Sequence, residues 1–392
     1  MIDETGPFLP RYGERTLAEV MPSLLSAMGI AGLPNPLRID PASRVSLLLI
    51  DGLGWELLRA HPSDAPFLTA LAETSEPLTA GFPATTCVSL VSLGTGRASG
   101  QHGIVGYSFA MPQIGLVNAL TWRTHDGGRP QDLRERLPPE QVQPLDTLVQ
   151  CTARAGRDVT LSAPAFQERS GLTRAALRGA RFRPVVALGD LAANLSGAEP
   201  GTFHYGYHGD LDQIGHRYGP GSLPWRLQLA QVDQLVASIA SRLEPGALLA
   251  VTADHGMVEV PESERIDADS DPRLLAGVRF LGGEVRVRHV YAESGAASDV
   301  LVAWRDTLGD RAWVRSRDEA IAAGWFGPAV TESARGRIGD VVVAMRGTAG
   351  VVRRTAEPLE TSLLGQHGSL TPAEQLVPLL LVRVARSRTG DL

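Results

Sequence analysis

The stretch VSLLLIDGLG, residues 45–54, decides the fold. Its run at residues 45–50 is short and apolar and ends at Asp51-Gly52, which predicts a central parallel strand buried on both faces. The same pattern recurs at residues 247–252, just before Asp254. Active sites in open α/β sheets collect at the carboxyl ends of the strands. Both carboxylates are therefore predicted to lie at one site.

The length and composition are those of a globular α/β enzyme. The chain has 392 residues, of which 43% are hydrophobic, so it can bury a substantial core. The net charge of −6 and the pI near 5.9 argue against binding to nucleic-acid polymers, because such partners require a basic face. All 37 basic residues are Arg, which excludes a Lys Schiff base or a P-loop Lys.

Cysteine content and hydropathy indicate where the protein works. Only Cys87 and Cys151 occur, which is too few for a disulfide framework or a cysteine zinc knuckle. The N-terminal residues lack a basic segment followed by an apolar one, so no signal peptide is predicted. The longest apolar runs are too short to span a bilayer. We therefore expect a cytoplasmic protein without membrane contacts.

The pattern along the chain predicts a core interrupted by a smaller unit. A helix is expected at residues 17–28, and another begins at Thr86, after Pro83. Residues 100–143 are predicted to be rich in loops. Residues 258–345 change in character and indicate an inserted α+β subdomain, with strands at 284–290 and 340–345 and a helix at 297–308. The catalytic core is then formed by residues 1–257 and 346–392.

Six potential metal ligands occur in four short motifs. They are Asp51 in LLLIDGLG, Asp212 and His216 in DLDQIGHRYGP, Asp254 and His255 in VTADHG, and His367 in GQHGS. Carboxylates and imidazoles together suit Zn²⁺, and two such ions can stabilise the attacking and leaving oxygens of an in-line displacement. Thr86, at the predicted start of a helix, stands where a nucleophile is needed and where a phosphate would be favoured. The glycines around His216 favour a loop for its motif.

Together these motifs resemble the alkaline phosphatase superfamily, and within it the nucleotide pyrophosphatase/phosphodiesterase (type I phosphodiesterase) family. The resemblance extends over residues 45–385. It implies a three-layer α/β sandwich with a mostly parallel central sheet and two zinc ions. One zinc would be held by Asp212, His216 and His367, and the other by Asp51, Asp254 and His255 with the Thr86 oxygen close by. Thr86 would attack phosphorus and form a covalent intermediate that water then hydrolyses.

The substrate contacts are less clearly marked. The family often has Asn three residues after the nucleophile, whereas this chain has Ser89, which offers one short hydroxyl donor. The backbone beside Cys87 can supply a further donor. Tyr107 and Trp122, like Tyr205 and Tyr207, can stack on a nucleobase or simply pack in the core.

The motifs thus predict a dizinc phosphodiesterase or nucleotide pyrophosphatase that acts on a small phosphate ester or nucleotide. Three alternatives remain open. The same groups can serve a phosphomonoesterase or a phosphonate hydrolase. A phosphoglycerate-mutase-like enzyme is disfavoured by the F-P-x-x-T motif at residues 82–86. A catalytically inactive module that binds phosphate ligands is disfavoured because all six ligands and Thr86 are present. The sequence does not indicate an oligomeric state.

Overall fold

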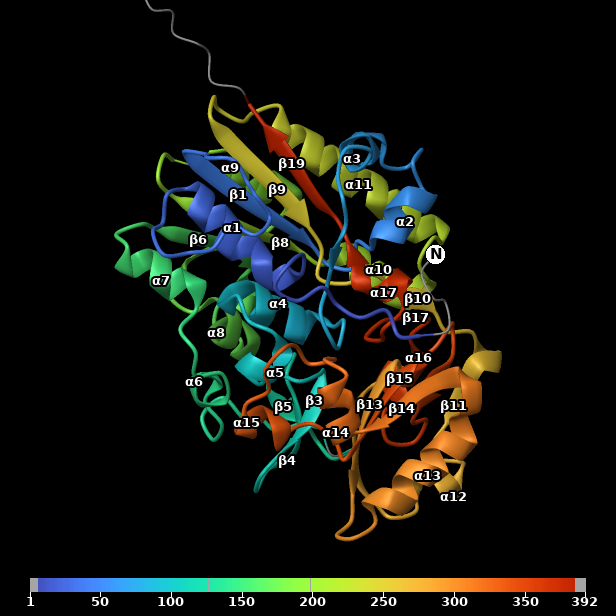
Figure 1. Cartoon of the computed structure of the whole chain (residues 1–392). Helices are drawn as coiled ribbons and strands as arrows, with labels where there is room; N and C mark the ends of the chain where they lie inside the picture. The colour runs from blue at the N-terminus through green and yellow to red at the C-terminus, as the bar shows by residue number, and fades with distance from the viewer. Residues whose placement is uncertain (1–5, 126, 198, 385–392) are drawn as a thin grey trace, which may run out of the picture.

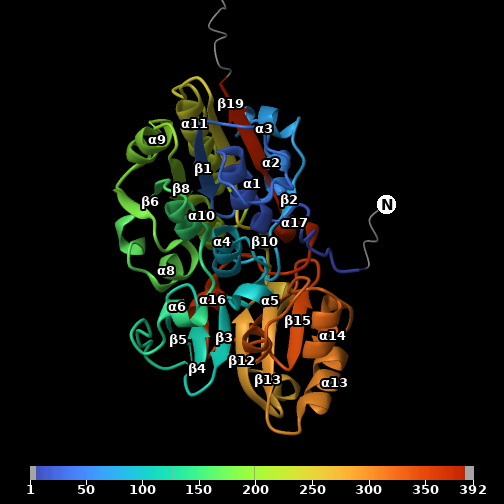
Figure 2. The same ribbon diagram turned by 60° about the vertical axis from the view of Figure 1, so that its left-hand side comes forward.

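The computed structural model describes residues 6–125, 127–197 and 199–384. The predicted ends of the core, at 1–5 and 385–392, lie outside the described residues. Figures 1 and 2 show two lobes, with the larger one built on a central sheet and the smaller one below it.

A six-stranded sheet forms the centre of the larger lobe, in the order β19-β9-β1-β8-β6-β7. Five strands are parallel, and only the edge strand β19 runs antiparallel to its neighbour β9. In β1 and β9 every residue except Arg44 is buried and most residues are apolar, as expected for parallel strands covered on both faces. Their bounds are β1 Arg44–Ile50, β6 Val159–Pro164, β7 Arg181–Val185, β8 Phe203–His208, β9 Ala247–Thr252 and β19 Leu379–Arg383.

Helices cover both faces of this sheet, which makes a three-layer α/β sandwich. One face carries α1, α4 and α7, with α8 packed beside α4, and the other carries α9 and α11 (Figures 1 and 2). Helix α10 precedes α11 at the carboxyl end of β8. The bounds are α1 Val20–Ala27, α2 Trp55–Ala60, α3 Pro66–Ala72, α4 Thr86–Thr95, α7 Leu148–Arg154, α8 Gly171–Leu177, α9 Leu188–Ser196, α10 Asp210–Tyr218 and α11 Leu223–Ala240. The predicted three-layer fold is confirmed.

The smaller lobe contains a four-stranded antiparallel sheet in the order β12-β13-β15-β14. Helix α13 covers one face, and a second hydrophobic cluster lies between them. The bounds are β11 Arg265–Asp267, α12 Pro272–Leu275, β12 Val278–Glu284, β13 Val287–Ala292, α13 Ala297–Leu308, β14 Ala312–Ser316, α14 Arg317–Ala322, α15 Glu332–Arg335, β15 Val341–Met345 and β16 Gly350–Val352. Strand β16 pairs with β11, so this lobe extends past residue 345, where the sequence pattern placed its end.

Short elements complete the chain between and around the lobes. The segment predicted to be rich in loops instead holds a three-stranded sheet, β3-β4-β5, which packs against β12. The bounds are β2 Leu78–Thr79, α5 Ser99–His102, β3 Ser108–Met111, β4 Gly115–Asn118, β5 Arg123–Thr124, α6 Pro139–Val142, β10 Val258–Glu259, α16 Pro358–Ser362, β17 Gly365–Gln366, α17 Pro372–Gln375 and β18 Leu376–Val377. The predicted strand at 284–290 is two strands of a hairpin, because the chain turns at residues 285–286.

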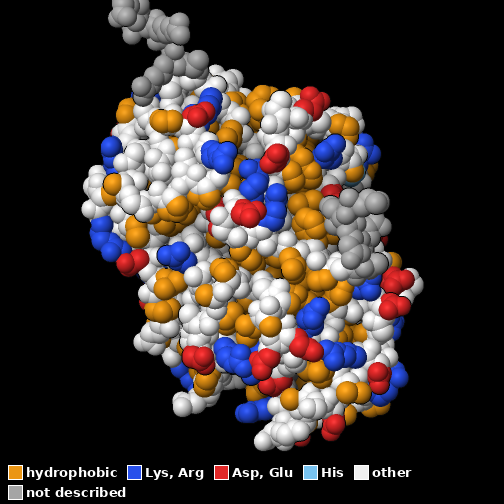
Figure 3. Space-filling model, in the orientation of Figure 1, with side chains coloured by type: hydrophobic (Ala, Val, Ile, Leu, Met, Phe, Trp, Pro, Cys, Tyr) orange, Lys and Arg blue, Asp and Glu red, His pale blue; other side chains and the backbone are white. Residues whose placement is uncertain are grey.

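The surface carries both signs of charge. On the face shown in Figure 3, basic and acidic side chains are interspersed among apolar ones. Within the described ranges, no helix has the length and apolar character needed to cross a bilayer.

Candidate metal and phosphoryl-transfer site

Strand ends of the central sheet bring the first ligand cluster together. Asp51 follows β1, and Asp254 and His255 follow β9. The Nε2 atom of His255 lies 3.4 Å from Asp51 Oδ1 and 3.4 Å from Asp254 Oδ2. All three side chains are buried. The other Asp254 oxygen accepts hydrogen bonds from the backbone N–H groups of Gly52 and His255, which fixes the orientation of the carboxylate.

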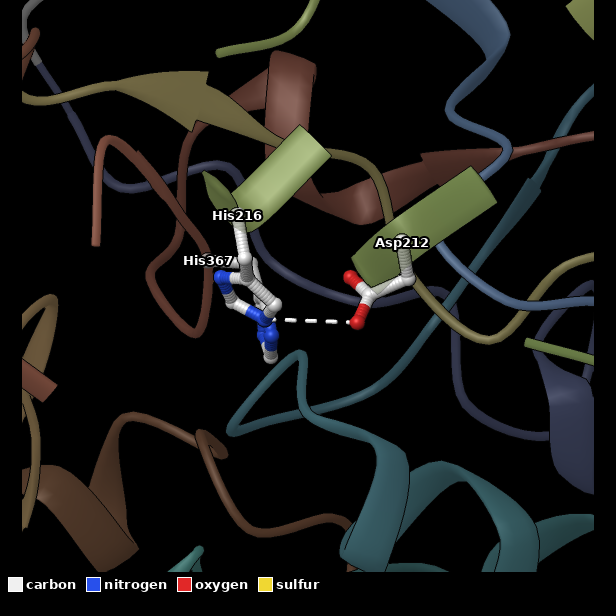
Figure 4. A group of neighbouring side chains, drawn as sticks. All are labelled: Asp212, His216 and His367. Carbon is white, nitrogen blue, oxygen red and sulfur yellow. Dashed lines mark ion pairs between the residues drawn. The ribbon is translucent and has the colours of Figure 1, made fainter. Parts of the chain in front are cut away.

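The second cluster joins helix α10 to the segment after β17. Asp212 and His216 lie four residues apart on α10, and His216 Nε2 is 3.3 Å from Asp212 Oδ2. His367 turns toward them from the loop after β17 (Figure 4). The expectation of a loop for this motif is wrong. A helix places positions i and i+4 on one face, and that spacing aligns the two ligands.

Gly52 allows the two clusters to approach. It follows Asp51 with φ of +72°, in the left-handed region that favours glycine. A Cβ atom there would lie 3.0 Å from the Cβ of Asp212. The rings of His255 and His367, one from each cluster, stack with centroids 3.5 Å apart.

The donor atoms of both clusters fit divalent metal ions. Each of the three histidines has its Nδ1 directed at a backbone carbonyl, namely Gly256 for His255, Gly365 for His216 and Ala84 for His367. These contacts leave Nε2 free to coordinate a metal ion. Asp51 Oδ1, Asp254 Oδ2 and Asp212 Oδ1 are buried with no hydrogen-bond partner in the described part of the chain. Buried carboxylate oxygens without partners are costly, and cations at these positions would relieve the cost.

The titratable groups of the two clusters shift one another's pKa values. Burial, together with the charges of Asp254 and Asp212, holds the pKa of Asp51 well above its usual value. Burial also acts to raise the pKa of Asp212, but neighbouring histidines, His216 foremost, outweigh it and keep this pKa below its ordinary range. Burial acts to lower the pKa of His216, yet Asp212 raises it to about 9. Burial and the other histidines hold the pKa of His367 well below 6.5.

Thr86 is the first residue of α4 and faces the first cluster. Its Oγ1 lies 3.2 Å from His255 Nε2, and the side chain is nearly buried. Thr85 precedes the helix in an extended conformation, so the N-terminal backbone N–H groups and the positive end of the helix dipole are at Thr86. A hydroxyl beside a ligand cluster, with helix N–H groups at the same point, is suited to attack on a phosphate.

Two cavities meet at Thr86. The first, of about 560 Å³, is lined by Asp51 of the first cluster and by all three residues of the second, and we call it the metal cavity. The second, of about 530 Å³, extends past Thr121 to Arg123 and Arg134 and is named the arginine cavity. They share five lining residues: Thr86, Leu120, Phe166, Gln167 and Tyr207. Phe166 is 80% exposed and Leu120 43% exposed, so the shared rim is apolar.

Only some of the predicted substrate contacts reach these cavities. Tyr107 lines the metal cavity and donates a hydrogen bond from its hydroxyl to Glu360. Cys87 also lines it, and burial raises the pKa of its thiol well above the usual value. Ser89 instead is fully buried and donates to the backbone carbonyl of Asp254 at 2.7 Å. Its hydroxyl is thus bonded within the protein, and Ser89 is not among the described residues that line the metal cavity, so the phosphate contact stays a prediction.

Of the aromatic candidates, Trp122 also lies away from the metal cavity. Its indole N–H donates to the carbonyl of Leu137, and the ring is buried in the core. Tyr205 is buried within β8. Tyr207 alone of the β8 pair lines both cavities, and its hydroxyl donates to Asp51 Oδ2. Tyr207 therefore orients a predicted metal ligand.

The structure adds a residue that the sequence pattern did not indicate. Glu284, the last residue of β12 in the smaller lobe, lines the metal cavity and accepts a hydrogen bond from Thr85 Oγ1 at 3.2 Å. Burial raises its pKa to about 8. In the sequence it stands within an unremarkable strand-like segment, so only the packing of the two lobes reveals its place.

This fold, with ligand clusters and a helix-terminal hydroxyl at the carboxyl edge of the sheet, places the chain in the alkaline phosphatase superfamily. Within that superfamily, the sequence model of the type I phosphodiesterase/nucleotide pyrophosphatase family matches residues 45–370, and the chain belongs to this family.

Solved structures extend the likeness over both lobes. Murine ectonucleotide pyrophosphatase/phosphodiesterase 5, as an inactive variant in complex with AMP, superposes with a TM-score of 0.66 at 17% identity, covering 86% of this chain and 87% of that one. Phosphonoacetate hydrolase from Sinorhizobium meliloti 1021, in complex with phosphonoacetate, gives a TM-score of 0.62 at 19% identity over 90% and 92% of the two chains. These likenesses establish the fold.

A shorter sequence match is to a phosphopentomutase. Phosphopentomutase from Anaeromyxobacter sp. (strain K) is 34% identical over 88 residues, which is 22% of this chain and 22% of the mutase. The matched part is therefore less than a quarter of that protein.

Proposed function

We propose that the chain is a dizinc phosphodiesterase or nucleotide pyrophosphatase that hydrolyses a small phosphate ester through a covalent intermediate on Thr86. The observation that carries this proposal is the position of the Thr86 hydroxyl, beside one ligand cluster and at the meeting point of two cavities. One zinc would be held by Asp51, Asp254 and His255, and the other by the cluster on α10 with His367. When bound, the two ions would stabilise the attacking and leaving oxygens.

The residues of this chain then act in two displacements. The Thr86 oxygen forms a bond to phosphorus as the bond from phosphorus to the leaving oxygen breaks; the hydroxyl proton passes to solvent and the departing oxygen takes one up. The N–H groups at the start of α4 orient the phosphoryl oxygens. Water then attacks phosphorus, which releases the phosphate monoester and restores the Thr86 hydroxyl. Two in-line displacements predict net retention of configuration at phosphorus.

Two features favour a diester over the alternatives, a phosphomonoester or a phosphonate. A diester has an organic group on each side of phosphorus, and two cavities extend from Thr86. A monoester or a carboxylated phosphonate brings additional negative charge. Among the described residues that line the metal cavity there is no Arg to receive that charge.

The test compares hydrolysis of bis-p-nitrophenyl phosphate, p-nitrophenyl phosphate and thymidine 5′-monophosphate p-nitrophenyl ester by zinc-loaded protein at pH 8, with metal content measured on the same sample. We expect faster turnover of the diesters with about two zinc ions per chain. A preference for the monoester would instead favour the phosphomonoesterase alternative.

Thr86→Ala tests the nucleophile. We expect turnover to fall by at least ~10³-fold while zinc stays bound, because the substitution removes the attacking oxygen and none of the six ligands. The control is Thr95→Ala in the same helix, where the hydroxyl only bonds the carbonyl of Val91. Mass spectrometry of quenched wild-type protein should detect Thr86 that carries the phosphoryl group together with the organic group that has not left. Wild-type rates in Thr86→Ala would reject the assignment.

A further inference from the structure

The described charged side chains that line the metal cavity are mostly acidic. Five acidic residues line it, together with His216 and His367, and no described Arg does so. Asp51 and Asp212 belong to the ligand clusters, whereas Asp210, Glu284 and Glu360 do not. Three carboxyl groups are therefore left to face whatever organic group enters with the phosphate.

Glu284 is the most deeply placed of these three. Its Oε2 accepts the hydrogen bond from Thr85, but its Oε1 is buried with no hydrogen-bond partner among the residues that the structure describes. A Cβ on residue 368 would lie 3.0 Å from that oxygen, so Gly368 leaves the room that the carboxyl occupies. His367 Nδ1 lies 3.8 Å from Oε2 but donates to the carbonyl of Ala84 at 3.0 Å. Among the described residues, the one hydrogen-bond donor to this carboxyl is Thr85, which is neutral.

Two neighbouring buried carboxylates differ from Glu284 because each is paired with an arginine. Glu374 forms a paired contact with Arg286, and Glu357 is paired with Arg288. Both arginines belong to the same hairpin as Glu284. A buried carboxylate is stable only with a compensating charge or full hydrogen bonding. Because this hairpin pairs two carboxylates and leaves the one facing the cavity unpaired, the missing partner is expected from the ligand.

The metal ions do not supply that partner. On the proposed function, two divalent ions would be matched by the carboxylates of Asp51, Asp254 and Asp212 and by the single negative charge of a phosphodiester. Glu284 adjoins His367, in the second cluster, whereas Thr86 adjoins the first cluster. In-line attack directs the leaving group away from Thr86, and thus toward the second cluster, whose His367 adjoins Glu284.

We propose that Glu284 selects phosphodiesters whose leaving group carries a cation, such as a protonated or quaternary amine, over those whose leaving group is anionic. Glu360 and Asp210 add to the same preference at the rim. An anionic group would find its counterion only in the arginine cavity, on the other side of Thr86, where Arg123 accompanies the ion pair of Arg134 and Asp132. This inference rests on the proposed function and specifies its substrate class.

The experiment uses three methyl aryl phosphodiesters that differ in one substituent of the leaving phenol. The substituent is trimethylammoniomethyl, its uncharged isostere neopentyl, or carboxymethyl, and phenol release is followed by absorbance with the zinc-loaded full chain. Rates are measured at pH 9, far above the ordinary pKa of a carboxyl group. We expect kcat/KM for the cationic ester to exceed that for the anionic one by about tenfold.

Glu284→Gln should lower this ratio several-fold, because it removes the charge and keeps the shape. Comparing ratios between proteins cancels the intrinsic reactivity of each phenol. Glu293→Gln, at an exposed position of the same lobe, is the control and should keep the wild-type ratio. Glu360→Gln should lower the ratio by less, since Glu360 is half-buried, and it tests the proposal even if Glu284→Gln does not fold.

The possible results distinguish a failure of this inference from a failure of the proposed function. Hydrolysis of all three esters without a charge preference would overturn the inference alone, as would a ratio that neither Glu284→Gln nor Glu360→Gln changes. Failure to hydrolyse any of the three, with two zinc ions bound, would overturn the proposed function and the inference together.

Discussion

His216 links proton binding to metal binding at the second cluster. Asp212 raises the pKa of His216 to about 9 in the metal-free protein, although burial acts in the opposite direction. A metal ion requires the neutral imidazole, so it must displace a proton at every pH below about 9. We expect zinc affinity of this cluster to fall by about tenfold for each pH unit below that value. Titration with a competing chelator between pH 6 and 9 measures it.

Without bound metal, rising pH has the opposite effect, because it lowers the stability of the fold. There the folded-state pKa of His216 lies above 6.5, so its ion pair stabilises the fold fully below about pH 6.5. That stabilisation is lost as the pH rises through about 9. His216→Gln should remove both effects, the proton competition for zinc and this pH-dependent stability. A zinc affinity that does not change between pH 6 and 9 would contradict the assignment.

Tyr207 and Tyr205 provide a matched pair on one strand. The Tyr207 hydroxyl donates to Asp51, whereas the Tyr205 hydroxyl is buried and no described residue is its hydrogen-bond partner. Groups that orient a ligand typically contribute a factor of 10–100 in metal affinity, so we expect about tenfold weaker zinc binding at the first cluster in Tyr207→Phe. Tyr205→Phe should not weaken it. Equal zinc affinities in the two variants, measured by chelator competition, would show that the hydroxyl does not hold Asp51.

Helix α10 shows how an element can depend on a residue that disfavours it. Gly215 lies in its interior, yet a Cβ there would be 2.6 Å from Met257 Sδ. Glycine lets the helix pack closely enough for His216 to reach Gly365 on β17. Gly215→Ala gains about 1 kcal/mol of helix propensity but overpacks the contact, which typically costs about 1–3 kcal/mol.

We therefore expect Gly215→Ala to lower both the free energy of unfolding and the zinc content. The control is Gly189→Ala in α9, where a Cβ would meet nothing within 4 Å. That change should stabilise the protein slightly, by about 0.5–1 kcal/mol. Urea denaturation of both variants distinguishes the outcomes; a stabilised Gly215→Ala would show that the helix can move away from Met257.

At the level of elements, sequence reasoning succeeds where one local pattern determines the structure. Buried parallel strands are continuous apolar runs, so β1 and β9 could be located, and with them the carboxylates that follow. Helix α13 has the expected bounds for the same reason. The loop predicted at Asp212 is wrong because glycine, which disfavours helix interiors, here serves a tertiary contact within α10.

Sequence reasoning fails where the structure depends on distant segments. Strands β3, β4 and β5 are two to four residues long and are stabilised by pairing with one another and by β12, so no periodicity marks them. Ser89 has the right spacing for a phosphate contact, but its helix turns the hydroxyl toward Asp254. Glu284 enters the site from another lobe, and nothing in its local sequence indicates a cavity.

The two lobes are joined through the same segment that carries His367. Arg286, at the turn of the β12–β13 hairpin, donates from Nε and Nη2 to the two carboxylate oxygens of Glu374 at 3.0 and 2.7 Å, with both side chains fully buried. Glu374 also accepts from the backbone N–H of Ser369, two residues after His367. The smaller lobe therefore helps to position the second ligand cluster, and the main hydrophobic core includes its residues Trp325 and Phe326, which pack against Phe82.

This continuity predicts that the lobes unfold together. Breaking the buried pair with Glu374→Gln leaves Arg286 without its charge partner, which typically costs about 3–5 kcal/mol. Asp318→Asn, which removes an exposed pair with Arg335 in the same lobe, should change the free energy of unfolding far less. Because the two lobes share a hydrophobic core, Glu374→Gln should lower the hydrogen-exchange protection of backbone amides in β9 and in β13 by the same amount. Loss of protection in β13 alone would mean that the smaller lobe opens independently and that His367 can be released without unfolding the central sheet.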